Sequence, residues 1–562
     1  MSPEEFLELL QEVGSDDPRF LRLPVEGNLN LAEWEKSHPS VKRIPACIIK
    51  GDVDARGCKS LERLDCKVEG TVDLRKSGVV ELGKSFSSSG DFLAAECTRL
   101  KVLRGHFGAD VLLQSSSIVE IPSGVKIAGS LSISKCDYLI TVGCEVGGSL
   151  HAVRSGISSL GKDFRCAGDV NIQNCPNLKT LGYIGSPRDV YLTNSGVEAV
   201  DEDFECRESF YANDNKKLRR VGDSSGINVG KVLLVSGSPR ISSVKVTKVK
   251  GDSQIVRCQS LKEVAGHFSG SLFLSRCGVE NLTDALRTGG NLIVEKCPKL
   301  KSLSPRSARN IELSDLRSLD LVSGKMKCGN DMIIHHCPSL KKISGEIVGD
   351  FLLFGPVNIP VIDQTLKIQG GFRSAGATRS GKNFRADLVK IGRIEAQFGG
   401  EVTLNQVHLG STGSSFSCES FYMGMIHSNP DLRGKVRGNV AVGHSPIEKI
   451  GAAFECGGDM KLEKCMALSG LNCNISGNLL LFECLVPALL PAFHCSGSVM
   501  FLDCVNSEGE RVPKLVIPTS TQSSIVSPST PKKNDKIPSL KKPSLNPSRN
   551  SRPAEPTAKS VI

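Results

Sequence analysis

A ladder of cysteines at constant spacing is the feature that most constrains the fold of this chain. Cys58, Cys97, Cys136 and Cys175 are each 39 residues apart, and after a shift in register Cys258, Cys297 and Cys337 resume the series. A leucine column from Leu61 to Leu340 and a glycine column from Gly51 to Gly168 follow the same spacing. Several columns with one period predict a repeat array, in which each unit packs only on its neighbours.

Each 39-residue unit divides into two similar halves of roughly 20 residues. In one half Val170 and Ile172 alternate with polar residues between Gly168 and Cys175, and Leu150 and Ala152 alternate in the other. Such alternation is typical of a short strand with one buried face, and the flanking glycines and cysteines mark turns. The sequence therefore predicts a mainly β fold, an elongated solenoid of roughly 20-residue rungs paired into 39-residue units.

The repeat also resembles a known family. Leu131, Ile133, Cys136, Leu139 and Val142 form the pattern L-x-I-x-x-C-x-x-L-x-x-V, which is similar to the constant part of a leucine-rich repeat with cysteine in the usual asparagine position. The rest of each unit is too short and glycine-rich for a regular helix, so the resemblance is to compact, bacterial-type repeats or a β-solenoid. The resemblance implies architecture and leaves function open, because such arrays serve as binding platforms in many settings.

The 21 cysteines are predicted to be structural thiols and not disulfides. Rungs lie about 5 Å apart, so cysteines two rungs apart are about 10 Å apart, which is too far for a disulfide bond. Free thiols favour a reducing, cytoplasmic compartment. No stretch of the sequence is long and apolar enough for a membrane span, and no Sec-type signal peptide is recognised at the N-terminus. Secretion into a host cell without such a signal stays an alternative.

The chain is predicted to have five parts. Residues 1–26 form an N-terminal helix and cap, in which Ser2 and Glu5 make a capping box and Phe6, Leu9, Leu10 and Val13 form an apolar stripe. Residues 27–369 are a regular repeat solenoid. Residues 370–399 are an irregular basic insertion or a kink, with Arg373, Arg379, Lys382, Arg385 and Lys390. Residues 400–505 are a looser solenoid, and 506–562 are a disordered tail rich in proline, serine and lysine.

Charge argues against nucleic-acid binding by the array. The last 50 residues of the chain, from Pro513, carry nine Lys or Arg against Asp535 and Glu555, and this excess of +7 accounts for most of the formal +10 of the whole chain. The solenoid is therefore nearly neutral and has no basic footprint for nucleic acid. Short basic pairs in the tail leave a nuclear-import or anionic-surface role open, although a solvated tail is the simpler interpretation.

No catalytic module is recognised in the sequence. His335 and His336 precede Cys337 and suggest a nucleophile with its base, but Cys337 belongs to the cysteine ladder and His335 falls on an outward strand position. Phosphate-binding, serine-hydrolase and zinc-protease motifs are not found, and no Cys-x-x-Cys pair suggests a metal. The sequence thus predicts a protein that is not an enzyme, without cofactors or metals.

The outward positions of the strands are the predicted binding surface. They are mostly polar in the first half of the array, and they become apolar or aromatic later, where exposed side chains of this kind suggest a contact surface. The predicted partner-binding residues are Tyr191, Tyr211, Phe273, Ile293, Ile333, Leu352 and Phe354.

These observations favour a non-enzymatic scaffold that binds an unknown protein partner on the exposed strand face. One alternative is a bacterial effector delivered into a host cell, which the array resembles in its repeats. Another is the substrate-recognition part of an enzyme complex. The partner, the oligomeric state and the role of the tail stay open at this point.

Overall fold

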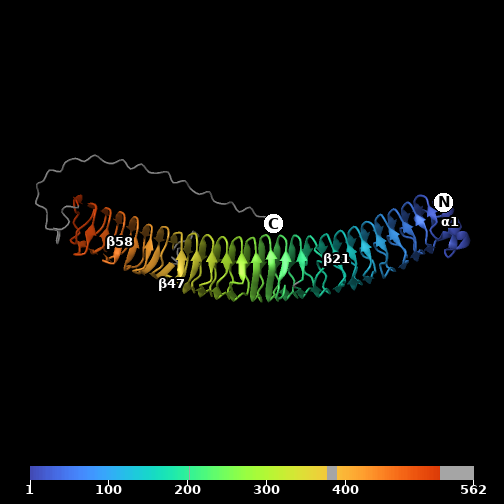
Figure 1. The fold of residues 1–562 in the computed structure, drawn as a ribbon, viewed down its shortest axis with the longest axis horizontal. Helices are drawn as coiled ribbons and strands as arrows, with labels where there is room; N and C mark the ends of the chain where they lie inside the picture. Colours follow the sequence, from blue (N-terminus) through green and yellow to red (C-terminus); the bar gives the residue numbers. More distant parts are fainter. Residues whose placement is uncertain (202, 376–388, 519–562) are drawn as a thin grey trace, which may run out of the picture.

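The computed structural model describes residues 1–201, 203–375 and 389–518. The chain is a parallel β-solenoid of about 23 turns, with 39% of its residues in strands and 4% in helices. Figure 1 shows a long, gently bent rod in which the rungs follow one another in sequence order from the N-terminal helix. The predicted mainly β solenoid of roughly 20-residue rungs is confirmed.

Helix α1 (Pro3–Val13) closes the N-terminal end of the rod. Ser2 Oγ accepts a hydrogen bond from the Glu5 amide at 3.2 Å and the Glu5 carboxylate accepts one from the Ser2 amide at 2.8 Å, so the predicted capping box is present. Phe6, Leu7 and Leu10 are buried in the core. Leu7 replaces the more exposed Leu9 in the predicted stripe, because the helix meets the first rungs on that side. The other helical segments are η1 (Pro18–Phe20) and α2 (Leu31–Trp34).

One face of the rod is a single long sheet with one strand per rung. Its parallel strands pair in sequence order with matching positions opposite each other. They are β2 (Leu29–Asn30), β5 (Val53–Asp54), β8 (Val72–Asp73), β11 (Phe92–Leu93), β13 (Val111–Leu112), β16 (Leu131–Ser132), β19 (Leu150–His151), β22 (Val170–Asn171), β24 (Val190–Tyr191), β27 (Phe210–Asn213), β30 (Leu233–Ser236), β32 (Ser253–Val256), β34 (Leu272–Ser275), β37 (Leu292–Glu295), β40 (Ile311–Ser314), β43 (Met332–His335), β46 (Phe351–Phe354), β49 (Phe372–Ala375), β51 (Val402–Asn405), β54 (Phe421–Gly424), β56 (Val440–Gly443), β59 (Met460–Glu463), β62 (Leu479–Phe482) and β65 (Val499–Leu502).

Shorter sheets form the other two sides of each rung. The second side begins with β1 (Pro24–Val25), β4 (Ile48–Ile49) and β7 (Lys67–Val68), and it includes β21 (Arg165–Cys166) and β58 (Phe454–Cys456). The third side begins with β3 (Arg43–Ile44), β6 (Arg63–Leu64) and β9 (Glu81–Leu82). Longer strands occur towards the middle of the rod, among them β31 (Ser243–Val249) and β47 (Val357–Ile362). Strands therefore surround a narrow core on three sides.

The core is filled by the alternating inward side chains that the sequence predicts. Leu272 and Leu274 of β34 are fully buried, as are Val170 and Ile172 at the corresponding positions of an earlier rung. Burial of every rung's apolar residues against the next is the main stabilising term of such an array.

A polar Asp, Ser or Asn, in many rungs preceded by glycine, lies directly before the strand and builds a ladder of hydrogen bonds at a corner of the rod. Asp110 Oδ1 accepts from the amide of Ser130 at 2.7 Å, Ser130 Oγ accepts from the amide of Ser149 at 3.1 Å, and Ser149 Oγ accepts from the amide of Asp169 at 2.9 Å. These bonds satisfy backbone donors where the chain turns. A Cβ on Gly129 would lie 2.6 Å from the backbone carbon of Ala109, which explains the glycine column.

Extra residues are absorbed within single rungs without interrupting the long sheet. The step from Phe210 of β27 to Leu233 of β30 is longer than its neighbours, and this accounts for the shift in the cysteine ladder. Within 370–399, β49 pairs with both β46 and β51, so the long sheet runs through the segment. Arg373 and Lys390 belong to strands there, whereas Arg379, Lys382 and Arg385 lie outside the described residues.

The fold continues past residue 505, where the sequence predicted that the array ends. Strand β66 (Leu515–Ile517) turns back and pairs antiparallel with β65, Met500 lying opposite Val516. Its three apolar residues follow a polar stretch that contains Pro513, and they form a strand by pairing with the last rung. The rest of the predicted disordered tail, 519–562, lies outside the described residues.

Candidate protein-binding ribbon

The outward side chains of the long sheet form a continuous surface, which we call the ribbon. It consists of the residues at the second position of each strand, with those at the fourth position beside them. The structure places all seven predicted binding residues on it: Tyr191, Tyr211, Phe273, Ile293, Ile333 and Leu352 in the first row and Phe354 in the second. They are half-buried rather than fully exposed, because each is flanked by its neighbours in the adjacent rungs.

Tyr191 and Tyr211 form the first aromatic contact along the ribbon. They lie opposite each other in β24 and β27, with ring centroids 5.0 Å apart and planes 6° from parallel. Partial burial raises the pKa of the Tyr191 phenol, with Asp189 adding to the effect, so the hydroxyl stays protonated near neutral pH and can donate a hydrogen bond. A flat, half-buried aromatic pair with polar tips is typical of protein contact surfaces.

Two further apolar groups follow along the rod. Phe273 pairs with Ile293 across β34 and β37, and Ile333 pairs with Leu352 across β43 and β46. Phe354 stacks on the imidazole of His335 with ring centroids 4.8 Å apart. Glu312 separates the two groups and Arg373 follows the second, so the predicted residues form a row that single polar residues interrupt.

Leu234 was missed by the sequence analysis. It lies half-buried on the ribbon between Tyr211 and Gln254, and it extends the aromatic pair by one rung. Leu233, Leu234 and Val235 are all apolar, so the sequence does not show which of them point inward. The rung before them is longer than its neighbours, so the spacing from the preceding repeat also fails to show it. Counting back five residues from the cysteine column, which Ser238 occupies here, identifies Leu233 as inward and Leu234 as outward.

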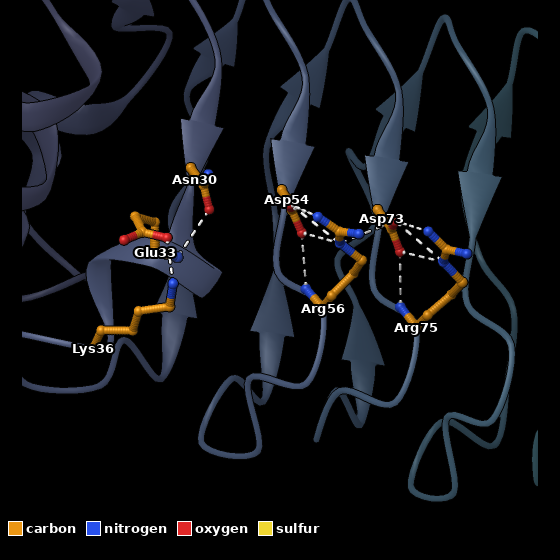
Figure 2. A network of polar contacts seen from close by, with 7 residues as sticks. All are labelled: Asn30, Glu33, Lys36, Asp54, Arg56, Asp73 and Arg75. Carbon is orange, nitrogen blue, oxygen red and sulfur yellow. Dashed lines mark hydrogen bonds and ion pairs between the residues drawn. The ribbon is translucent and has the colours of Figure 1, made fainter.

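The N-terminal part of the ribbon is largely polar, apart from Leu93 and Leu112, and its charged side chains form ion pairs with one another. Figure 2 shows Asp54 with Arg56 and Asp73 with Arg75 on consecutive strands. Each arginine binds the aspartate of its own strand through two nitrogens, with closest distances of 2.7 Å for Asp54 and 2.6 Å for Asp73. Arg56 also lies 3.5 Å from Asp73 of the next rung. The charges on these two strands are paired with one another, and the longer apolar series from Tyr191 onward is the candidate site.

Comparison with protein-family models, curated proteins and solved structures finds no match to this chain. The function of the ribbon is therefore inferred from its side chains and their contacts.

His335 and Cys337 do not form a nucleophile and base. Cys337 is fully buried and its thiol faces the backbone carbonyl of His335 at 3.4 Å, while the imidazole of His335 lies on the ribbon against Phe354. Burial raises the pKa of the Cys337 thiol to about 12 and lowers the pKa of His335, so neither group is charged near neutral pH. Among the described residues, no group of three His, Cys, Asp or Glu side chains is placed to hold a metal ion.

All 21 cysteines fall in the described part of the chain, where all are buried and none forms a disulfide bond. In the ladder, the Cys97 thiol donates to the Leu74 carbonyl at 3.0 Å and the Cys136 thiol to the Leu113 carbonyl at 3.0 Å. Cys258, Cys277 and Cys297 occupy consecutive rungs that lie only about 5 Å apart, and not alternate rungs about 10 Å apart. These three thiols are also buried in the core without a disulfide bond. Neither helix in the described residues could cross a membrane.

Proposed function

We propose that this protein is a non-enzymatic scaffold that binds a protein partner on the apolar part of its ribbon, from Tyr191 to Phe354. The observation that carries the proposal is the series of half-buried aromatic and aliphatic side chains that lie in register on successive rungs of the ribbon. A row of apolar groups in a fixed register, separated by single polar residues, combines the hydrophobic area and the polar points that protein interfaces use.

We also propose a distant relationship to the leucine-rich repeats, on the basis of the cysteine and leucine columns. The buried, unpaired thiols support a reducing compartment for the protein. The relationship to the leucine-rich repeats goes beyond the β-solenoid fold itself. In this solenoid, strands occupy the two remaining sides of the rungs.

The experiment compares the proteins captured by the tagged full-length chain with those captured by a Tyr211→Ser, Phe273→Ser double variant. We expect a partner that depends on the ribbon to be lost from the variant, because anchoring aromatic residues contribute about 2 kcal/mol or more each. His151→Ser is the matched control, since His151 occupies the same row in the polar part.

Stability measurements show whether the variant is folded. Phe273 projects from the sheet, and its replacement is expected to lower the free energy of unfolding by about 1 kcal/mol or less. Leu272→Ala removes a fully buried side chain and is expected to cost about 2 to 5 kcal/mol. The proposal fails if the folded double variant captures the same proteins as the parent.

A further inference from the structure

The ribbon between Tyr191 and Arg373 has complementary residues at equal distances from its centre. Its first row is the in-register series Tyr191, Tyr211, Leu234, Gln254, Phe273, Ile293, Glu312, Ile333, Leu352 and Arg373. The centre of this series lies between Phe273 and Ile293. Polar Asn171 precedes the series and polar Thr403 follows it, so both ends stop at the same distance from the centre.

Reversing the series on itself brings together side chains that attract one another. Phe273 meets Ile293, Leu234 meets Ile333, and Tyr211 meets Leu352, so apolar residues face apolar residues. Gln254, which is exposed, meets the carboxylate of Glu312 and can donate a hydrogen bond to it. Tyr191 meets Arg373, an exposed guanidinium that can lie over the phenol ring.

We infer that two copies of this chain pair through their ribbons about a two-fold axis that runs parallel to the strands between Phe273 and Ile293. This axis makes the two rods antiparallel and keeps the strand directions the same, so that the first row of one copy faces the first row of the other. An isologous contact of this kind requires self-complementarity of one patch, and the order of residues in the ribbon supplies it. The inference rests on the proposed function and names the partner as a second copy.

The second row does not oppose the contact. Under the same axis, Ser275 faces Glu295, Val256 faces Ser314, and Asn213 faces Phe354, so no two like charges meet. At the rim Arg257 faces Asp315 favourably, and Arg276 faces Lys296 unfavourably where both are exposed to solvent and screened.

The size of the patch suits a reversible dimer. Ten strands at about 4.8 Å and four residues at about 3.3 Å give a flat footprint of roughly 600 Å² on each copy. The total of about 1,200 Å² is at the lower limit for specific protein interfaces. Another protein or the residues after 518 are the competing occupants of the ribbon, and the experiment distinguishes them from a second copy.

Cross-linking between purified copies tests the register directly, because the 21 native cysteines are buried. Full-length Gln254→Cys and Glu312→Cys variants are prepared separately, mixed, and treated with the thiol oxidant diamide, which accepts the two hydrogens that the two thiols lose. We expect the mixed sample to form a covalent dimer. Each variant alone is expected to cross-link weakly, because like positions lie three rungs, about 14 Å, apart along the rods.

Charge variants at Gln254 test the two-fold axis, because they are expected to change the dimer affinity in opposite directions. Gln254→Glu places two carboxylates opposite each other at two places in the dimer and is expected to weaken association about tenfold. Gln254→Lys creates two ion pairs there and is expected to strengthen it. Sedimentation equilibrium measures both, with His151→Lys as the control outside the patch.

Three results would overturn the inference. The first is a protein that stays monomeric at roughly 100 μM, a concentration far above the Kd of specific complexes. The others are a dimer whose affinity both Gln254 charge variants leave unchanged, and efficient cross-linking of Gln254→Cys with itself. In the first case the capture experiment still decides whether the ribbon binds a different protein. The proposed function fails only if ribbon variants leave that capture unaffected.

Discussion

At the scale of the residue, the cysteines show how one small side chain serves a narrow core. A thiol fits where the chain turns inward, and it donates to a backbone carbonyl about one rung away, as Cys175 does to Ala152 at 2.8 Å. Serine, asparagine and leucine occupy the same column in other rungs, as at Ser195, Asn215 and Leu316. The column therefore selects small or apolar side chains that pack on their neighbours, and cysteine meets both requirements.

Burial of these thiols predicts that the solenoid loses stability in alkaline solution. The pKa of Cys144 is raised by burial from 9.0 to about 12. The unfolded chain therefore loses this proton first, so the stabilising contribution is complete below about pH 9 and is lost as the pH rises towards 12. Parent and Cys144→Ala are compared by urea unfolding from pH 8 to 11. Above pH 9 the parent should lose about 1 kcal/mol more per pH unit than the variant. Parallel pH profiles would show that the Cys144 thiol is accessible in the folded state.

At the scale of the element, most strands of the long sheet are followed by a turn residue in the left-handed conformation. Among the described residues, twenty non-glycine residues have positive φ. Twelve of them directly follow a four-residue strand of the long sheet, as Arg276 at 55° and Glu483 at 49° do, and Ser115 at 57° lies three residues after β13. This conformation places a Cβ close to the following carbonyl and costs about 1 to 2 kcal/mol per residue. The packing of the cysteine column beneath it holds the turn in place.

Substitutions at this turn are predicted to have opposite effects. Ser115→Gly removes the steric penalty and should stabilise the protein by about 0.5 kcal/mol, after the greater freedom of glycine in the unfolded chain is subtracted. Gly57→Ala, at φ 74° with no atom within 4 Å of the added Cβ, should destabilise it by about 1 kcal/mol. Urea unfolding of both variants checks this. A destabilised Ser115→Gly would mean that the serine makes a contact that outweighs its backbone strain.

At the scale of the whole molecule, the strands of the long sheet pair only with those of adjacent rungs in the described part of the chain. Every rung pairs with the rung before and the rung after it, from β2 to β65. The two ends are closed differently: α1 covers the first rungs and the antiparallel β66 lies on the last. Stability should therefore be a sum of local terms.

Loss of an end cap is predicted to act locally. Phe6 is fully buried and contacts Phe20 edge to face with ring centroids 5.5 Å apart. Phe6→Ala should cost about 3 to 5 kcal/mol in the N-terminal rungs and raise their amide hydrogen exchange, leaving the rungs beyond Phe268 unchanged. Phe421→Ala, which also empties a fully buried site, should affect only the rungs around β54. Increased exchange along the whole rod in either variant would indicate global cooperative unfolding.

The sequence alone determined the period, the inward columns and the burial of the cysteines, because a periodic fold repeats the same environment at a fixed spacing. Leu272 and Leu274 were assigned inward and Phe273 outward from alternation alone. Hydrogen bonding across the Gly-[Asp/Ser/Asn] corner, the longer rung before Leu233 and the strand at Leu515–Ile517 were not predicted, since they depend on which segments stack.

Only the tertiary structure decided which outward residues are neighbours. Tyr211 and Leu234 are adjacent on the ribbon although the rung between them is longer than its neighbours, and Arg373 stays in register with Leu352 in a segment that was predicted to be irregular. The physical reason is that backbone hydrogen bonds between strands set the register, while insertions leave through the corners of the rungs. Sequence spacing is preserved within a rung, and spatial order along the rod is set by the stacking of the rungs.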